Sequence, residues 1–235
     1  MDFDNQITDI TARLETLGDA DRREKAKTYH PTKMRVIGVK IPDLRPVIKE
    51  YSAKFKKSPP EEVIAFAKAL VDTDIFECHG FAYELLSRNK RALASLTLEE
   101  VEYLGKCLDN WGLVDAYACL VAGRVWREGR IPDELIIDWA KSPDRWLRRT
   151  AVVCTVPFNQ KTGGGTGNKE KTLMICRIVA DDQDDMVAKA LSWALRKLSG
   201  FEPAAVRDFI EEYRQVLPKR VIREVEHKLT TGKKN

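Results

Sequence analysis

The sequence predicts an all-α fold in which short helices stack in antiparallel pairs. Three observations lead to that prediction. Apolar residues recur at helical spacing along most of the chain, helix start signals precede many of these stretches, and no segment shows the strict apolar–polar alternation of a half-buried strand. Turns such as Arg88-Asn89-Lys90 and Ser142-Pro143-Asp144 separate the stretches.

The start signals and the periodicity place each expected helix. Ser58, Pro59 and Pro60 precede one apolar-periodic stretch, and Thr97 with Glu100 gives the spacing of a capping box before another. The helices are expected at residues 60–71, 75–86, 96–108, 110–125, 132–139, 145–154, 171–179, 185–198, 203–213 and 219–229.

Successive helix pairs recur at roughly 35–45 residues, the spacing of HEAT-type repeats, in which each pair stacks on the next. No sequence signature recurs from pair to pair, and no shift in composition marks a boundary. A globular helical bundle is the alternative, but the spacing favours a HEAT-like repeat solenoid. We expect a single domain over residues 1–235.

Composition and charge narrow the class of protein. Hydrophobic residues make up 43% of the chain, enough for a sizeable core, and 40 basic against 36 acidic residues give a net charge of +4. That charge is too small to identify a nucleic-acid partner by itself. The chain has no apolar run of the ~18 residues that a membrane span needs. Five cysteines without C-x-x-C spacing argue against a disulfide framework or zinc site, so we expect a reduced, intracellular protein.

The glycine-rich segment at residues 159–169, with Gly163 to Gly167 at its centre, is expected to be a flexible loop between helices. It lacks the lysine of a phosphate-binding P-loop, because Asn168 follows Gly167, and no strand precedes it. A nucleotide site is therefore rejected. The loop either rests on a backbone phosphate or is simply solvated.

No metal or organic cofactor is expected. Asp181, Asp182, Asp184 and Asp185 stand where a helix begins, which favours capping over cation binding. The three histidines, His30, His79 and His227, have no metal-ligand spacing. Lys219, Arg220 and Arg223 begin the final helix and either extend a basic rim or solvate a terminal repeat.

One tryptophan and one aspartate fall away from the expected core face of the helix at 110–125. Leu113, Tyr117, Leu120 and Val121 share the core face, whereas Trp111 and Asp115 lie one turn apart on the far side, in a row continued by Ala118 and Ala122. This pattern indicates an open aromatic–acid site. The alternative is a tryptophan packed on a neighbouring helix beside an ordinary surface aspartate.

Basic residues accompany a second off-core tryptophan. Trp193 lies off the apolar face of the helix at 185–198, flanked by Lys189 and Arg196, and Arg149 lies opposite the core on the helix at 145–154. In stacked helix pairs such faces can line one concave surface, where cations meet phosphates and rings meet sugars or bases. A solvated face would explain the cations but not the tryptophans.

The ordered set of motifs resembles a known family. The carrying residues are Tyr29 with Gly38 nine residues later in GVKIPDLR, then Asn110-Trp111-Gly112-Leu113-Val114-Asp115, then Trp146-Leu147-Arg148-Arg149-Thr150-Ala151, then Lys189-Ala190-Leu191-Ser192-Trp193-Ala194-Leu195-Arg196. Over roughly residues 25–200 the chain resembles the AlkD-like DNA alkylation-repair glycosylases, which are built from HEAT-like repeats.

The resemblance implies an enzyme that excises positively charged N3- or N7-alkylated purines, such as 3-methyladenine and 7-methylguanine, without needing base flipping. Asp115 matches the catalytic carboxylate, and Trp111 and Trp193 match the aromatic pair at the lesion. Arg149, or the adjacent Arg148, matches the phosphate-contacting arginine. Tyr29 lies near the lesion, and Lys189 and Arg196 are expected to contact DNA.

The same resemblance implies a concave surface that binds duplex DNA, no cofactor, no membrane, a monomer, and a cytoplasmic, nucleoid-associated location in a prokaryote. Gly112 and the long loop at residues 163–167 depart from the family pattern. The rival hypotheses are a non-catalytic relative that binds bent or branched DNA and a protein-interaction scaffold.

Overall fold

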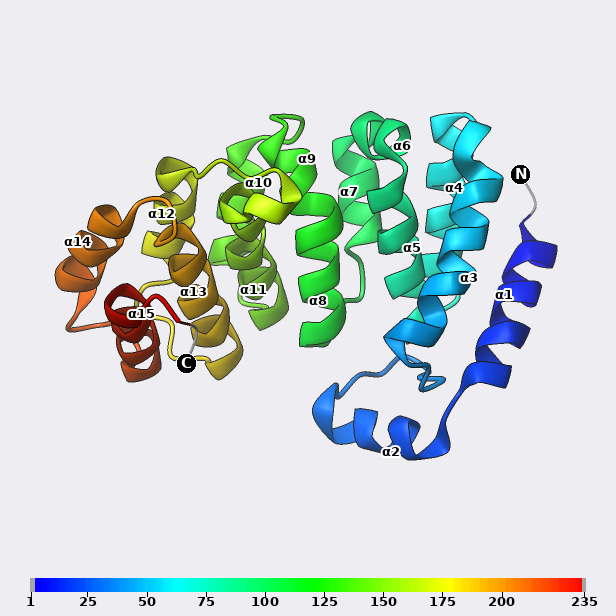
Figure 1. Ribbon diagram of the computed structural model, residues 1–235, viewed down its shortest axis with the longest axis horizontal. Coiled ribbons are helices and arrows are strands. Elements are labelled where there is room, and N and C mark those ends of the chain that lie inside the picture. Colours follow the sequence, from blue (N-terminus) through cyan, green and yellow to red (C-terminus); the bar gives the residue numbers. More distant parts are fainter. Residues whose placement is uncertain (1–2, 234–235) are drawn as a thin grey trace. The chain divides into compact units, whose positions relative to one another are not determined.

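The computed structural model describes residues 3–233 and divides the chain into two compact units, one ending at Val121 and the other beginning at Ala122. Each unit consists of packed helices (Figure 1). Within residues 3–233, no helix combines the length and the apolar character that crossing a membrane requires. The expectation of one domain over residues 1–235 stays a prediction.

The first unit has two layers of helices. In one layer α3 lies between α1 and α5, and α5 continues to α8; in the other, α4 packs against α6 and α7. The contact between α4 and α5 joins the layers. The helices are α1 (Asp4–Leu17), α2 (Ala20–Tyr29), α3 (Ile41–Lys54), α4 (Pro60–Val71), α5 (Phe76–Arg88), α6 (Lys90–Ser95), α7 (Leu98–Leu104) and α8 (Trp111–Tyr117).

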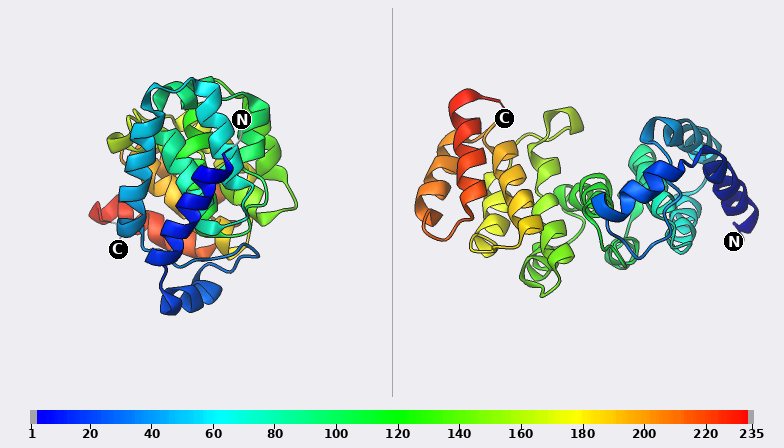
Figure 2. Two further views of the ribbon diagram at one scale, coloured as in Figure 1. Left: turned by 90° about the vertical axis from the view of Figure 1, so that its right-hand side faces the viewer. Right: turned by 90° about the horizontal axis from the view of Figure 1, so that it is seen from below.

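The second unit repeats a helix pair along the chain. In one layer α13 lies between α11 and α15; in the other α10 packs on α12, and the pairs α10–α11, α12–α13 and α14–α15 join the layers. The right-hand view of Figure 2 shows α12 to α15 side by side. The helices are α9 (Gly123–Arg127), α10 (Asp133–Lys141), α11 (Arg145–Val153), α12 (Lys169–Ile178), α13 (Asp185–Leu198), α14 (Pro203–Tyr213) and α15 (Lys219–Thr231).

The stacked pairs confirm the predicted fold class, an all-α repeat solenoid. In the second unit the first helix of each pair begins at residue 133, 169 or 203, close to the predicted spacing. The core face predicted for α13 is buried throughout: Val187, Ala190, Leu191, Ala194, Leu195 and Leu198 have no exposed surface. The predicted concave DNA-binding surface stays a prediction.

Several helices begin at the residues that local sequence signals predict. The Thr97 hydroxyl accepts a hydrogen bond from the Glu100 N–H, and the Glu100 carboxylate accepts one from the Thr97 N–H, completing the predicted capping box. Asp184 caps α13 by accepting from the Met186 N–H. The aspartate run thus serves the helix start, and in the described part of the chain no cluster of His, Cys, Asp or Glu could hold a metal ion.

The helix predicted at residues 110–125 is not continuous. After α8 the backbone forms a π-helical turn, Ala118–Ala122, before α9 begins. A π turn holds more residues than an α turn, so it changes which residues share a face. Ala118 and Ala122, predicted to continue the exposed row of Trp111 and Asp115, are fully buried instead, and Leu120, predicted in the core, is half-buried.

The glycine-rich segment lies in a loop between helices, as predicted, and part of this loop forms a regular turn. Within it, Lys161–Gly163 forms a 3-10 turn, and another 3-10 turn, Val156–Asn159, leads into the segment. The Arg127 guanidinium donates to the carbonyl oxygens of Pro157 and Gly163, at 3.0 and 2.9 Å. The loop therefore has a defined conformation that is held by hydrogen bonds.

Candidate nucleic-acid interface

The N-terminus of α8 positions the predicted catalytic residues of the first unit. The Asn110 side chain caps α8 by accepting from the Leu113 N–H at 3.0 Å, and Asn110 itself is fully buried. The adjacent carboxylate of Asp109 accepts from the Thr32 hydroxyl and the Lys33 N–H, each at 2.6 Å. These contacts join the start of α8 to the segment that follows α2.

An aromatic cluster forms where these two segments meet. The Trp111 indole N–H donates to the Tyr29 carbonyl oxygen at 2.8 Å. The His30 ring lies 4.2 Å from the Trp111 ring at an angle of 31°, and the Tyr29 ring meets Trp111 edge-on at 5.1 Å. Trp111 is thus half-buried, with its N–H satisfied and one side covered by the imidazole, while Tyr29 is 65% exposed.

Asp115 lies one helical turn beyond Trp111 on α8 and is half-buried. Four residues along an α-helix return to the same side, so the carboxylate and the indole share one side of α8. The structure therefore brings Tyr29, Trp111 and Asp115 into one region of the first unit, as the sequence predicted.

A cavity of about 690 Å³ adjoins this region, lined by α2, the segment after it, and parts of α3, α5 and α8. Its wall includes Glu77, a buried carboxylate that sequence reasoning missed. Glu77 accepts hydrogen bonds from three consecutive backbone N–H groups, those of Ile37, Gly38 and Val39, at 2.7–3.2 Å. The carboxylate thereby fixes the backbone between α2 and α3, and no cationic side chain within residues 3–233 forms an ion pair with it.

Gly112 leaves the space that His30 occupies. A Cβ atom at Gly112 would lie 2.8 Å from both Cε1 and Nδ1 of the His30 ring, closer than such atoms approach. His30 Nδ1 is buried and has no hydrogen-bond partner among the described residues. Burial lowers the pKa of His30 below its ordinary value, which favours the neutral imidazole that packs on Trp111.

In the second unit, the two arginines predicted to contact phosphate have partners within the protein. Arg148 Nε donates to the Asp182 carboxylate at 2.6 Å, and its NH1 donates to the carbonyl oxygens of Ser142 and Pro143. Arg149, predicted to lie opposite the core, is only 5% exposed and donates to the Met186 carbonyl oxygen. That prediction of its exposure is wrong, because its long side chain reaches from α11 to the start of α13.

The predicted residues of α13 differ in their surroundings. Lys189 pairs with Asp185 at 2.6 Å and is 43% exposed. Arg196 donates to the Ser192 carbonyl and hydroxyl oxygens and lies 3.5 Å from the Glu224 carboxylate, so it joins α13 to α15. Trp193 is half-buried and lines a second cavity, which confirms that it lies off the core face.

Sequence reasoning missed three lysines of the second unit that lie close to Trp193. Lys161, Lys197 and Lys228 line the same cavity as Trp193, and none of them forms an ion pair within residues 3–233. In the sequence, Lys161 and Lys197 were visible only as parts of a loop and a charged helix end. Their meeting place depends on how the loop folds.

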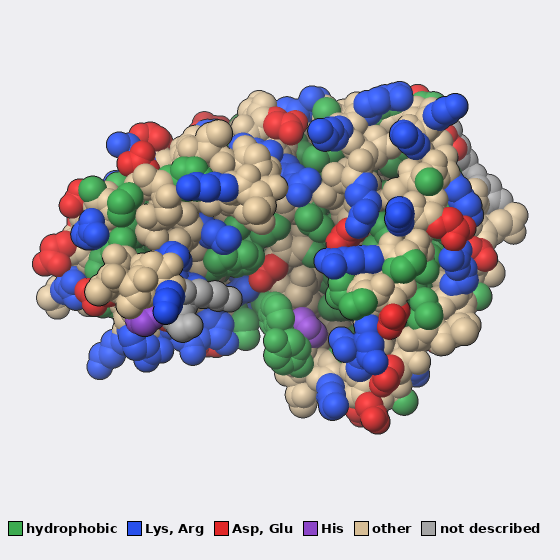
Figure 3. Space-filling view, viewed as in Figure 1, with side chains coloured by type: hydrophobic (Ala, Val, Ile, Leu, Met, Phe, Trp, Pro, Cys, Tyr) green, Lys and Arg blue, Asp and Glu red, His purple; other side chains and the backbone are tan. Residues whose placement is uncertain are grey.

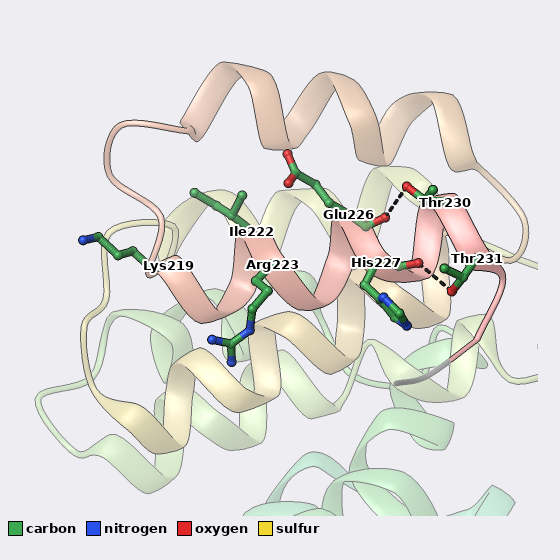
Figure 4. A pocket seen from close by; sticks show the side chains of 7 residues that line it. All are labelled: Lys219, Ile222, Arg223, Glu226, His227, Thr230 and Thr231. Carbon is green, nitrogen blue, oxygen red and sulfur yellow. Dashed lines mark hydrogen bonds between the residues drawn. The ribbon is translucent and has the colours of Figure 1, made fainter.

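The final helix carries a basic face, which is compatible with both sequence hypotheses, a basic rim and a solvated terminal repeat. Lys219, Arg223 and His227 follow one another at four-residue intervals and are exposed around a shallow hollow (Figure 4). Lys and Arg side chains gather over α15 in the space-filling view (Figure 3). Arg220, by contrast, pairs with Asp185 at 3.1 Å and contributes to packing between helices.

The chain matches a known protein family. The model of a family described as "DNA alkylation repair enzyme" matches residues 10–229. A solved structure from Enterococcus faecalis, described as a predicted DNA alkylation repair enzyme, superposes with a TM-score of 0.73 at 19% identity, over 91% of this chain and 97% of that one. At this identity the structural likeness shows the fold alone. Comparison with curated proteins gives no match.

Proposed function

We propose that this chain, which belongs to the family of DNA alkylation repair enzymes, is a DNA glycosylase that releases positively charged N3- or N7-alkylated purines from duplex DNA. The observation that carries the proposal is the pairing of Trp111 with Asp115 on one side of α8, beside the exposed Tyr29 ring. In this role the protein acts at the first step of base excision repair, and no cofactor is needed.

Release of an alkylated purine can be catalysed by a carboxylate and needs no general acid. An alkylated purine already carries a positive charge, so it leaves as a neutral base when the glycosidic bond breaks. The barrier is the positive charge that develops on the deoxyribose, which a nearby carboxylate stabilises. Asp115 also orients the attacking water and accepts its proton, and the products are the free base and an abasic sugar.

The other proposed residues bind and position DNA. Trp111 and Trp193 offer electron-rich ring faces that attract a cationic centre. Tyr29 lies beside the lesion. Arg148, Arg149, Lys189 and Arg196 supply positive charge, although each also has a partner within the protein. We also propose that the protein acts as a monomer in the cytoplasm, associated with the nucleoid in a prokaryote.

The proposal is tested by measuring release of 7-methylguanine and 3-methyladenine from methylated duplex DNA. Asp115→Asn is expected to lower the single-turnover release rate by at least about 100-fold, because it removes the charge that acts in the transition state. Affinity for DNA should change little. Asp208→Asn, a substitution of an exposed carboxylate on α14, is the control and should release base at the wild-type rate.

Two results would contradict the proposal. Normal release by Asp115→Asn would exclude this carboxylate from catalysis. A folded wild-type protein that binds duplex DNA but releases neither base would instead fit the rival hypothesis of a non-catalytic relative that recognises bent or branched DNA.

A further inference from the structure

A cavity of about 420 Å³ lies entirely within the second unit, between the glycine-rich loop, α13 and the end of α15. Two aromatic rings, Trp193 and Phe201, form part of its wall. Four basic side chains also line it: Lys161 from the loop, Arg196 and Lys197 from α13, and Lys228 from α15. No acidic residue lines it.

The loop is built to hold its part of this wall. At Gly167, whose φ of +90° is disfavoured for other residues, a Cβ atom would lie 2.9 Å from the Phe201 ring. Glycine therefore lets the loop backbone pack directly on Phe201. The Lys161 ammonium then lies 5.0 Å from the centre of that ring. Loop, ring and lysine form one packed group.

Within residues 3–233, three of the four cations that line the cavity have no carboxylate partner, although the Lys228 ammonium donates to the Gly232 carbonyl oxygen. Arg196 faces Glu224 at 3.5 Å, but Lys161, Lys197 and Lys228 have no carboxylate within 4.0 Å in the described chain. The hollow beside Arg148 is different, because Asp181 and Asp182 share its wall with Lys141. Of these two hollows, the one beside Trp193 is the one that attracts an anion.

We propose that this cavity binds a phosphodiester group of a DNA strand, with Trp193 and Phe201 packing against the adjoining sugar or base. Lysine ammonium groups bind phosphate as point charges, and aromatic rings beside cations are the usual arrangement along nucleic-acid strands. The proposal rests on the proposed function only in taking DNA as the ligand. It assigns to the glycine-rich loop a role in DNA binding that is separate from the chemistry at Asp115.

The test is the salt dependence of affinity for an undamaged duplex. Each phosphate contact contributes about 0.9 to the slope of log affinity against log salt concentration. We expect Lys161→Ala and Lys228→Ala each to reduce that slope by roughly one. Between 50 and 200 mM salt each variant should therefore lose about 4-fold less affinity than the wild type. Lys141→Ala, which removes an exposed lysine from the acidic hollow, should keep the wild-type slope.

A second variant tests the loop rather than a single charge. Gly167→Ala should displace the loop from Phe201 and reduce the slope as Lys161→Ala does. A thermal melt separates this effect from unfolding. If Gly167→Ala does not fold, the two lysine variants still decide the question.

The outcomes separate this inference from the proposed function. Unchanged slopes in both lysine variants would overturn the phosphodiester site, even if the wild type releases alkylated bases. A reduced slope supports the site even in a protein that releases no base, because the duplex carries no lesion. A wild-type protein that binds no duplex at all would overturn both proposals.

Discussion

Gly112 shows how strongly a single residue can determine the arrangement of the aromatic cluster. Because Gly112 has no side chain, the His30 ring can pack directly against its backbone, and that ring in turn covers Trp111. The sequence marked Gly112 only as a departure from the family pattern. In the structure it is the residue that permits a close stack at the proposed site.

We predict that Gly112→Ala lowers the rate of base release by 10-fold or more, because the imidazole must move and Trp111 moves with it. Displacements of about 1 Å at a reacting centre can cost about 100-fold in rate. Overpacking should also lower the free energy of unfolding by about 1–3 kcal/mol. Single-turnover release and a urea titration measure the two effects.

Gly80→Ala is the matched control for this substitution. Gly80 lines the same cavity, but a Cβ atom there meets nothing within 4 Å. Gly80→Ala should therefore leave the release rate close to wild type and raise the free energy of unfolding by up to about 1 kcal/mol, because alanine favours the helix. Equal release rates for the two alanine variants would show that the stack on Trp111 does not matter for catalysis.

The arginines show that the sequence does not predict where the end of a long side chain lies. Helical periodicity predicts the direction of a Cα–Cβ bond, and it placed Trp193 correctly off the core face of α13. It cannot predict where a long side chain ends. Arg149 begins on the predicted side of α11, yet its guanidinium is buried against the Met186 carbonyl.

At the scale of elements, the sequence was most informative where helices are regular. The limits of α4, α13 and α14 agree with prediction, because apolar periodicity and the residues at their starts point to the same boundaries. The π turn at Ala118–Ala122 was not predictable, since its extra residue leaves the composition of the stretch helical. The turn within the glycine-rich loop was not predictable, because it depends on contacts with Arg127 and with neighbouring segments.

Asn159 is the buried residue that ties this loop together. Its amide N–H groups donate to the Thr155 carbonyl and the Thr172 hydroxyl at 3.1 and 2.8 Å, and its oxygen accepts from the Asn168 N–H at 3.1 Å. We predict that Asn159→Ala lowers the free energy of unfolding by about 2–3 kcal/mol, because buried partners are left unsatisfied. A urea titration measures it.

Thr162→Ala serves as the comparison within the same loop. The Thr162 hydroxyl makes an exposed contact with the Gln160 side chain at 3.3 Å, so its loss should cost less than about 0.5 kcal/mol. Equal stabilities for the two variants would mean that the loop is held by its backbone contacts alone.

For the molecule as a whole, buried His79 and half-buried His30 make the response to acid differ between the two units. His30 and His79 both belong to the first unit, whereas His227 of the second unit is exposed. Burial lowers the pKa of His79 to about 4. Its Nε2 has no partner in the described chain, and its Nδ1 lies 3.4 Å from the Tyr83 hydroxyl.

The sign of the pH effect follows from that pKa. Between the ordinary value of about 6.5 and the folded value of about 4, the unfolded chain binds a proton that the folded chain does not. The contribution of His79 to stability is therefore present above pH 6.5 and falls as the pH drops toward 4. Its size is about 3 kcal/mol.

We predict that the first unit opens more readily than the second when the pH falls from 7 to 4.5. Hydrogen exchange followed by mass spectrometry, corrected for the intrinsic rates, measures this for segments before and after Val121. His79→Met, which keeps a buried apolar side chain of similar size, should remove most of the difference. Equal acid sensitivity of the two units would contradict the assignment to the histidines.

The charged helix α2 has a consequence for how the protein can adapt. None of its residues is buried, and its end is attached to α8 through the Trp111–Tyr29 hydrogen bond and the stacked imidazole. Segments with few buried contacts open at the smallest free-energy cost. When a ligand binds only after α2 rearranges, the rearrangement therefore reduces its binding free energy by little. Tyr29 is thus carried by a part of the first unit that can be remodelled around differently shaped targets while the core beneath stays intact.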